Sequence, residues 1–131
     1  MHLGEIVDTM EKGYREGKRV LRLHSGDPSL YGAIFEQMAE LRKRNISYQV
    51  IPGVTAAFAA AAAMGLEYTL PEVSQTLILT RMAGRTPVPE AESLDRLAAT
   101  GATLCVFLSV DRIDDRNAVI GYEGTAGPAP W

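Results

Sequence analysis

The spacing of apolar and polar residues predicts three helices in the first half of the chain. In residues 5–16, apolar side chains recur at intervals of three and four, which places them on one face of an amphipathic helix that ends at Gly17. The same spacing predicts a second helix over residues 30–45. The alanine-rich run 54–64 has high helix propensity and stops at Gly65, a residue suited to a helix C-terminus.

Short apolar runs predict strands between and after these helices. We expect strands at residues 19–23, 47–51, 75–81 and 102–110, with a further helix at 91–99 before the last strand. Strands that alternate with helices favour parallel pairing. The sequence therefore predicts the α/β class, with a parallel sheet and flanking helices.

The turn after the first predicted strand has the composition of a ligand-binding loop. It reads Ser-Gly-Asp-Pro at residues 25–28. In an open α/β sheet, small ligands bind beyond the carboxyl ends of the strands, where backbone N–H groups are free. Gly26 lets the backbone approach a ligand closely, while Asp27 is expected to cap the following helix and Pro28 to occupy its first turn.

A second turn repeats this arrangement one strand later, at residues 51–56, with the sequence Ile-Pro-Gly-Val-Thr-Ala. Gly53 permits close approach or an unusual dihedral angle, and Thr55 offers a hydroxyl group at a helix start. If strands 19–23 and 47–51 are neighbours, both turns open on one edge of the sheet and one elongated ligand could touch both. The alternative is that both turns only connect a strand to a helix, because Gly, Asp and Pro are common in any turn.

Composition and charge narrow the class of protein. The 131 residues are 47% hydrophobic and 22% charged, as in ordinary globular proteins, and the net charge of -3 argues against nucleic acid as a partner. The start of the chain does not resemble a signal peptide, and the longest apolar run is too short to span a bilayer, so we expect a cytoplasmic protein without membrane contact. His2 and His24 have no further ligands at metal-binding spacing, and we assign no metal site.

Four longer segments carry a more specific signal. They read LHSGDPSLYGAIFEQM, IPGVTAAFAAAAAMG, LPEVSQTLILTRMAGRTPVPE and GATLCVFLSV. In this order and at these separations, they closely resemble the tetrapyrrole methyltransferases of cobalamin (vitamin B12) biosynthesis. The resemblance covers about residues 1–110. The combination of SGDPSLYG with LPEVSQTLILTR and GRTPVPE is most similar to the branch of the family that methylates C-11 of precorrin-4 or cobalt-precorrin-4.

The resemblance implies a methyl donor, S-adenosylmethionine, bound between two α/β domains. By the same resemblance, the residues that border the donor are Gly26, Asp27, Leu30, Tyr31, Thr55, Ala56 and Leu108. The Asp27 carboxylate could also favour the positive charge of the donor, and capping its own helix is the alternative. Arg81 and Arg85 could pair with the acetate and propionate groups of a tetrapyrrole, or be exposed loop arginines without that role. No catalytic acid or base is identified.

The resemblance also implies how the chain divides. Residues 1–70 correspond to the C-terminal part of a first α/β domain and residues 71–110 to the start of a second, while residues 111–131 form an irregular tail unlike the family. Family members normally have a strand and a Gly-Pro-Gly-Asp-type loop before the region that corresponds to Met1. We therefore expect the first donor-binding loop, and the strands that finish the second domain, to be missing.

Three functions are compatible with these features. The first is S-adenosylmethionine-dependent methyl transfer to C-11 of precorrin-4 or cobalt-precorrin-4 by a homodimeric enzyme. The second is a catalytically inactive α/β fragment that only binds the donor or serves as an interaction module. The third is a related methyltransferase that acts on another tetrapyrrole.

Overall fold

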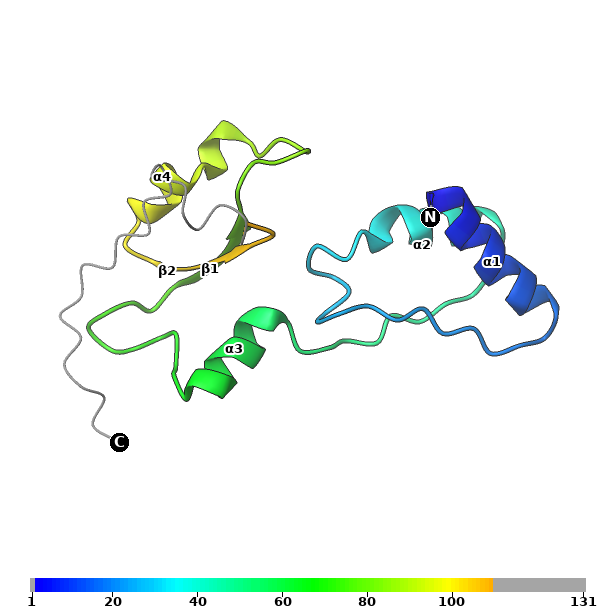
Figure 1. Cartoon of the computed structure of the whole chain (residues 1–131), viewed down its shortest axis with the longest axis horizontal. Coiled ribbons are helices and arrows are strands. Elements are labelled where there is room, and N and C mark those ends of the chain that lie inside the picture. The colour runs from blue at the N-terminus through cyan, green and yellow to red at the C-terminus, as the bar shows by residue number, and fades with distance from the viewer. Residues whose placement is uncertain (1, 110–131) are drawn as a thin grey trace. The chain divides into compact units, whose positions relative to one another are not determined.

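The computed structural model describes residues 2–109, so the predicted tail at 111–131 lies outside the described residues. The chain forms two compact units, Met1–Leu66 and a second unit that starts at Glu67 (Figure 1). The domain limits at residues 70 and 110 that the resemblance implies stay predictions. In the part of the chain that the structure describes, every helix is too short or too polar to cross a membrane.

The first unit contains three helices. They are α1 (Leu3–Arg15), α2 (Ile34–Lys43) and α3 (Ala56–Met64). The prediction for α1 is confirmed, and its start is stabilised by the Glu5 carboxylate, which accepts a hydrogen bond of 2.9 Å from the backbone N–H of His2. The prediction for α3 is also confirmed, including its end at Gly65, which has the left-handed conformation of a helix C-cap.

The predicted start of α2 is wrong by one turn. The helix begins at Ile34 rather than at residue 30, because Tyr31 (φ 54°) and Ala33 (φ 49°) have left-handed backbone conformations that an α-helix cannot include. Residues 27–30 form a separate turn, in which the N–H of Leu30 donates to the carbonyl oxygen of Asp27 at 3.2 Å. Asp27 therefore does not cap α2, and Pro28 does not lie in its first turn.

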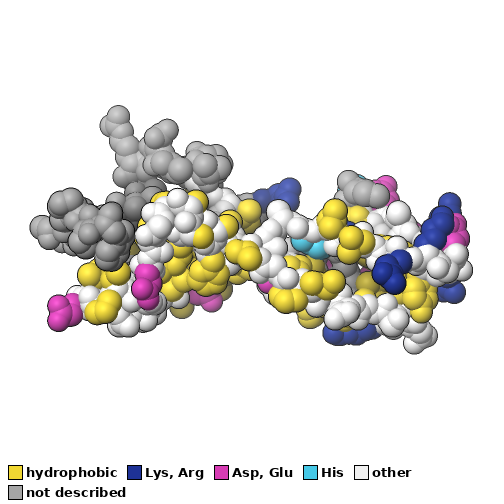
Figure 2. Space-filling model, turned by 90° about the horizontal axis from the view of Figure 1, so that it is seen from below, with side chains coloured by type: hydrophobic (Ala, Val, Ile, Leu, Met, Phe, Trp, Pro, Cys, Tyr) yellow, Lys and Arg dark blue, Asp and Glu magenta, His cyan; other side chains and the backbone are white. Residues whose placement is uncertain are grey.

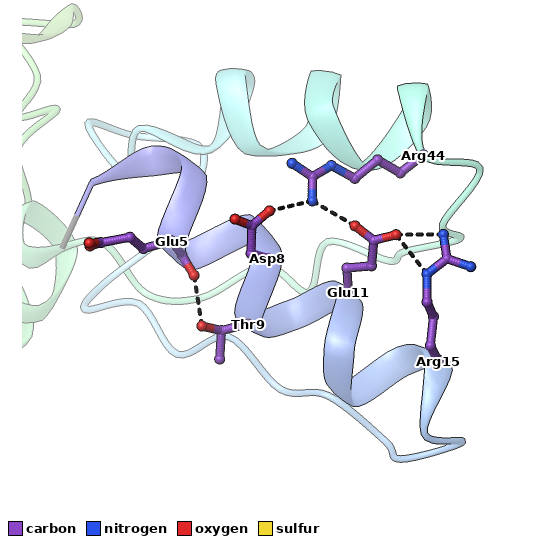
Figure 3. A network of polar contacts seen from close by, with 6 residues as sticks. All are labelled: Glu5, Asp8, Thr9, Glu11, Arg15 and Arg44. Atoms are coloured by element: carbon purple, nitrogen blue, oxygen red, sulfur yellow. Dashed lines mark hydrogen bonds and ion pairs between the residues drawn. The ribbon is translucent and has the colours of Figure 1, made fainter.

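A small apolar core and a group of ion pairs hold α1 against α2. Val7 is fully buried and packs with Leu41 and Ile46. At the end of α2, the Arg44 guanidinium lies 2.6 Å from carboxylate oxygens of both Asp8 and Glu11 (Figure 3). These contacts join residues more than thirty positions apart.

The Glu11 carboxylate receives a second arginine from its own helix. The Arg15 Nε donates to Glu11 Oε1 at 2.7 Å (Figure 3). Hydrogen bonds from Arg15, and then from Arg44, hold the pKa of Glu11 below its ordinary value. The charged form of this carboxylate is therefore favoured, and it accepts hydrogen bonds from both arginines.

The two strands predicted for the first unit are not formed. Residues 19–23 and 47–51 have no regular secondary structure. A strand is stabilised by a ladder of hydrogen bonds to a neighbouring strand, and among residues 2–109 these segments make none. Both segments are exposed and include apolar side chains, and Figure 2 shows apolar side chains on the surface of both units. The exposed apolar residues here include Val20, Leu21, Leu23, Val50 and Ile51.

The second unit contains the parallel strand pair that the sequence predicts. Its elements are β1 (Leu77–Arg81), the 3₁₀ helix η1 (Glu90–Glu92), α4 (Leu94–Ala98) and β2 (Thr103–Phe107). The strands pair in parallel, from Leu77 opposite Thr103 to Arg81 opposite Phe107. The helical segments lie in the crossover between the strands, so the prediction of an α/β fold with parallel pairing is confirmed.

The core of the first unit yields a stability prediction. Val7→Ala removes two methyl groups from a side chain with no exposed surface, and we expect it to lower the free energy of unfolding by about 2 kcal/mol. The measurement is urea unfolding followed by far-UV circular dichroism. The matched control is Val73→Ala, which makes the same change where the side chain is 67% exposed and should cost less than about 0.5 kcal/mol. Equal losses in the two variants would contradict the proposed core.

Candidate functional site

The two turns that the sequence singles out lie against each other within the first unit. Asp27 connects them through both oxygens of its carboxylate. Its Oδ1 accepts a hydrogen bond of 2.8 Å from the N–H of Ser29, in its own turn, and its Oδ2 accepts one of 2.9 Å from the N–H of Gly53, in the other turn. One side chain therefore sets both the shape of the first turn and its distance from the second.

Two glycines make this close approach possible. Gly26 has φ +67°, in the left-handed region that other residues rarely adopt. At Gly53 the reason is space, since a Cβ built there would lie 2.2 Å from the carbonyl oxygen of Gly26. Gly26 is also close to Thr55, whose Cα lies 3.6 Å from the position that a Gly26 Cβ would take. The backbones of the two turns are thus in direct contact.

The electrostatics of Asp27 follow from these hydrogen bonds. The N–H groups of Gly53 and then Ser29 stabilise the charged carboxylate and lower the pKa of Asp27 from its ordinary value. The carboxylate is therefore ionised at neutral pH. Both oxygens are already engaged by the protein backbone, which explains how the carboxylate is held in this turn although none of residues 2–109 forms an ion pair with it.

Thr55 and Ala56 lie where the second turn becomes a helix. Thr55 is the N-cap of α3, it is buried, and its hydroxyl group makes no capping hydrogen bond to the helix. Ala56 is the first residue of α3. The first turn of any helix has N–H groups without partners inside the helix, and these attract polar ligand atoms. The structure thus brings together four of the predicted residues: Gly26, Asp27, Thr55 and Ala56.

Leu30 and Tyr31 continue the first turn toward α2. Leu30 closes the turn by its hydrogen bond to Asp27, and Tyr31 has the unusual φ of 54°. Non-glycine residues in this conformation cost free energy and are enriched at functional sites. The turn thus departs from relaxed backbone geometry beside the predicted ligand-binding residues.

The remaining predicted residues lie in the second unit, at the carboxyl ends of its strands. Leu108 directly follows β2, has φ 54° and is 75% exposed. Arg81 is the last residue of β1, and Arg85 is exposed in the loop that follows. The backbone N–H of Met82 donates to the Ser109 hydroxyl at 3.2 Å, which joins the two strand ends. These residues belong to one end of the sheet in this unit.

Three polar groups form hydrogen bonds at the site that the sequence analysis did not predict. They are the N–H of Ser29, the N–H of Gly53 and the hydroxyl of Ser109. The Asp-Pro-Ser order is typical of a turn in which an Asp side chain accepts from the N–H two residues later, and this signal could have identified Ser29. The pairings of Gly53 and Ser109 join distant parts of the chain, for which one sequence contains no local signal.

Comparison with known proteins gives consistent results. Residues 1–120 match the family model of the Tetrapyrrole (Corrin/Porphyrin) Methylases. The chain is 55% identical over 114 residues to cobalt-precorrin-4 C(11)-methyltransferase of Methanocaldococcus jannaschii, a match that covers 87% of this chain and 44% of the relative. It is 56% identical over 110 residues to precorrin-4 C(11)-methyltransferase of Pseudomonas aeruginosa, covering 84% of this chain and 44% of the relative.

A solved structure agrees with these relatives. The X-ray structure of a cobalamin biosynthetic enzyme, cobalt precorrin-4 methyltransferase, superimposes with a TM-score of 0.79 at 54% sequence identity. That match covers 83% of this chain and 46% of the solved chain, so the chain spans less than half the length of the relatives it matches. Because the family model extends over most of its length, this chain belongs to the tetrapyrrole methylases.

Proposed function

We propose that this chain takes part in S-adenosylmethionine-dependent methyl transfer to C-11 of precorrin-4 or cobalt-precorrin-4, in cobalamin biosynthesis. Identities of 54–56% to relatives with these names favour that substrate within the family. The single observation that carries a role for this chain is the pair of turns joined by Asp27, which places Gly26, Thr55 and Ala56 side by side. The proposed donor site is built on this pair.

The residues of the two turns suit S-adenosylmethionine. The close contact of Gly26 with the second turn presents backbone rather than side chains, and Thr55 contributes a hydroxyl that is not used by its own helix. Leu30 and Tyr31, which continue the first turn, would supply apolar contacts to the donor. When bound, S-adenosylmethionine supplies an activated methyl group. The part of these residues in the reaction is to hold and orient the donor and to exclude water.

Asp27 enters the proposal as a residue that positions the two turns. A carboxylate that accepts from two backbone N–H groups has a fixed orientation, and its negative charge still acts on a cation nearby. We therefore expect Asp27 to favour binding of a positively charged donor in two ways: it fixes the positions of the two turns, and its negative charge attracts the donor. Removal of the side chain is expected to separate the turns as well as to reduce the negative potential.

Arg81 and Arg85 are proposed to contribute to binding of the anionic substrate. Arg81 is the last residue of β1 and Arg85 lies in the loop that follows, and a tetrapyrrole with acetate and propionate groups needs positive charge at its binding site. The two arginines differ in their surroundings, since Arg81 is half-buried and donates to backbone carbonyl groups whereas Arg85 is exposed. This difference implies different tasks for the two side chains.

A cytoplasmic location and association into a homodimer complete the proposal. The exposed apolar segments 19–23 and 47–51 favour association, because such surface is stabilised when it is removed from water.

Binding of S-adenosylhomocysteine, the product form of the donor, tests the site. We expect the chain to bind it with micromolar affinity in a calorimetric titration, or about -8 kcal/mol. Thr55→Val should weaken binding by about 1 kcal/mol, because one hydrogen bond is lost, whereas Thr55→Ser should retain it. The matched control is Thr9→Val on α1, which should bind as the wild type does. A folded chain that binds no S-adenosylhomocysteine would refute the donor site.

The contact between Asp27 and Gly53 predicts a pH dependence. The pKa of Asp27 is lower in the folded chain, so the contact stabilises the fold above the ordinary aspartate pKa and is lost as the pH falls through the lowered value. The chemical shift of the Gly53 amide proton, followed by NMR, should therefore titrate with a midpoint below the ordinary aspartate range. Asp27→Asn should abolish the titration. A midpoint at the ordinary value in the wild type would show that the contact contributes nothing.

A further inference from the structure

The guanidinium group of Arg81 is bound by the loop that follows it. Its NH1 donates to the carbonyl oxygens of Met82 at 3.2 Å and Thr86 at 3.1 Å, and its NH2 donates to that of Pro87 at 2.9 Å. Arginine has five N–H donors in a rigid, planar fork, so one side chain can hold several carbonyl groups at once. The guanidinium group of Arg81 is thus hydrogen-bonded to backbone carbonyl groups of its own loop.

These hydrogen bonds determine the shape of residues 82–87. The N–H of Gly84 donates to the carbonyl oxygen of Thr86 at 3.2 Å, so that oxygen accepts from both Gly84 and Arg81. The loop has no helix or strand of its own, and most of it is exposed. The guanidinium of Arg81 is therefore its main point of attachment to the end of β1.

Arg85 lies between Gly84 and Thr86, the two residues that the backbone hydrogen bond of this loop joins. It is exposed, and among residues 2–109 the structure gives it no hydrogen bond or ion pair. An arginine with this freedom can offer its full set of donors to a carboxylate from outside. The loop geometry therefore leaves Arg85, and not Arg81, able to meet a ligand.

The charges near Arg81 support this distinction. Arg81 lines a hollow of about 240 Å³, together with the acidic side chains of Glu90, Glu92 and Asp95. Of these acids, Glu90 pairs with Arg96 at 2.9 Å. Carboxylate groups of a substrate would be repelled by this acidic lining. An anionic ligand would thus avoid the side of the loop on which Arg81 lies.

We propose that Arg81 is a positioning residue, which folds residues 82–87 onto the end of β1 and so presents Arg85 to the carboxylate groups of a tetrapyrrole. This inference rests on the proposed function for the nature of the ligand. It assigns the two arginines different roles: Arg85 contacts the substrate, and Arg81 acts only through the loop.

Two measurements on the 131-residue chain test these roles. The first is hydrogen–deuterium exchange of the amides in residues 82–88. The second is a fluorescence titration with uroporphyrin III, a stable tetrapyrrole with eight carboxylate groups. Both are made on the wild type, Arg81→Gln, Arg81→Lys, Arg85→Gln and the double variant Arg81→Gln/Arg85→Gln. Arg96→Gln is the matched control, since it removes an exposed arginine of the same unit.

We expect Arg81→Gln to speed loop exchange and to weaken uroporphyrin binding, each by about tenfold, because hydrogen bonds from a charged group are lost. Arg81→Lys keeps the charge but not the fork and should behave similarly. Arg85→Gln should weaken binding by about tenfold with unchanged loop exchange. Arg96→Gln should leave both quantities near their wild-type values. Unchanged exchange in the first unit serves as the control for folding.

The double variant separates an indirect role from a direct one. If Arg81 acts only through Arg85, the double variant binds uroporphyrin no more weakly than Arg85→Gln alone. Additive losses, or weaker binding by Arg81→Gln with unchanged loop exchange, would overturn the inference. The inference would also be overturned if the wild-type chain bound S-adenosylhomocysteine but not uroporphyrin. That result would leave the proposed donor site unaffected. Failure to bind S-adenosylhomocysteine would refute the donor site alone.

Discussion

The bidentate hydrogen bonding of Asp27 is the interaction on which the candidate site depends. A single carboxylate accepts from Ser29 and from Gly53, and so joins two turns that are separated by a helix in the sequence. The contact depends on both glycines, because a Cβ at Gly53 would collide with the carbonyl oxygen of Gly26 and because Gly26 has a positive φ that other residues rarely adopt. The negative charge, the close backbone approach and the start of α3 therefore belong to one arrangement.

The second unit uses the same kind of interaction with the opposite sign of charge. Arg81 donates to carbonyl groups of the loop after β1, much as Asp27 accepts from N–H groups of the turns in the first unit. In both cases a charged side chain is oriented by backbone groups. A residue with strained backbone lies near each of them: Tyr31 soon after Asp27 in the sequence, and Leu108 directly after Phe107, which pairs with Arg81. Both strained residues belong to the set that the family resemblance assigns to the donor.

The packing of the first unit explains why its helices form although its predicted strands do not. Helices satisfy their backbone hydrogen bonds internally, and α1 and α2 add a small core around Val7 and the ion pairs of Arg44. Segments 19–23 and 47–51 have strand-like composition, but a strand needs a neighbour to complete its hydrogen bonds. Their apolar side chains are left exposed in the absence of such a neighbour.

The sequence by itself determined the features that depend on local spacing and propensity. It predicted α1, α3, the parallel strands β1 and β2, and the two turns that carry Gly26 and Gly53. Only the tertiary structure decided that α2 starts at Ile34, that Asp27 binds Gly53 instead of capping a helix, and that Arg81 is bound by its own loop. The physical reason is that hydrogen-bond partners are chosen by distance in space. The apolar spacing along a chain reports which face is buried, but not which polar groups meet.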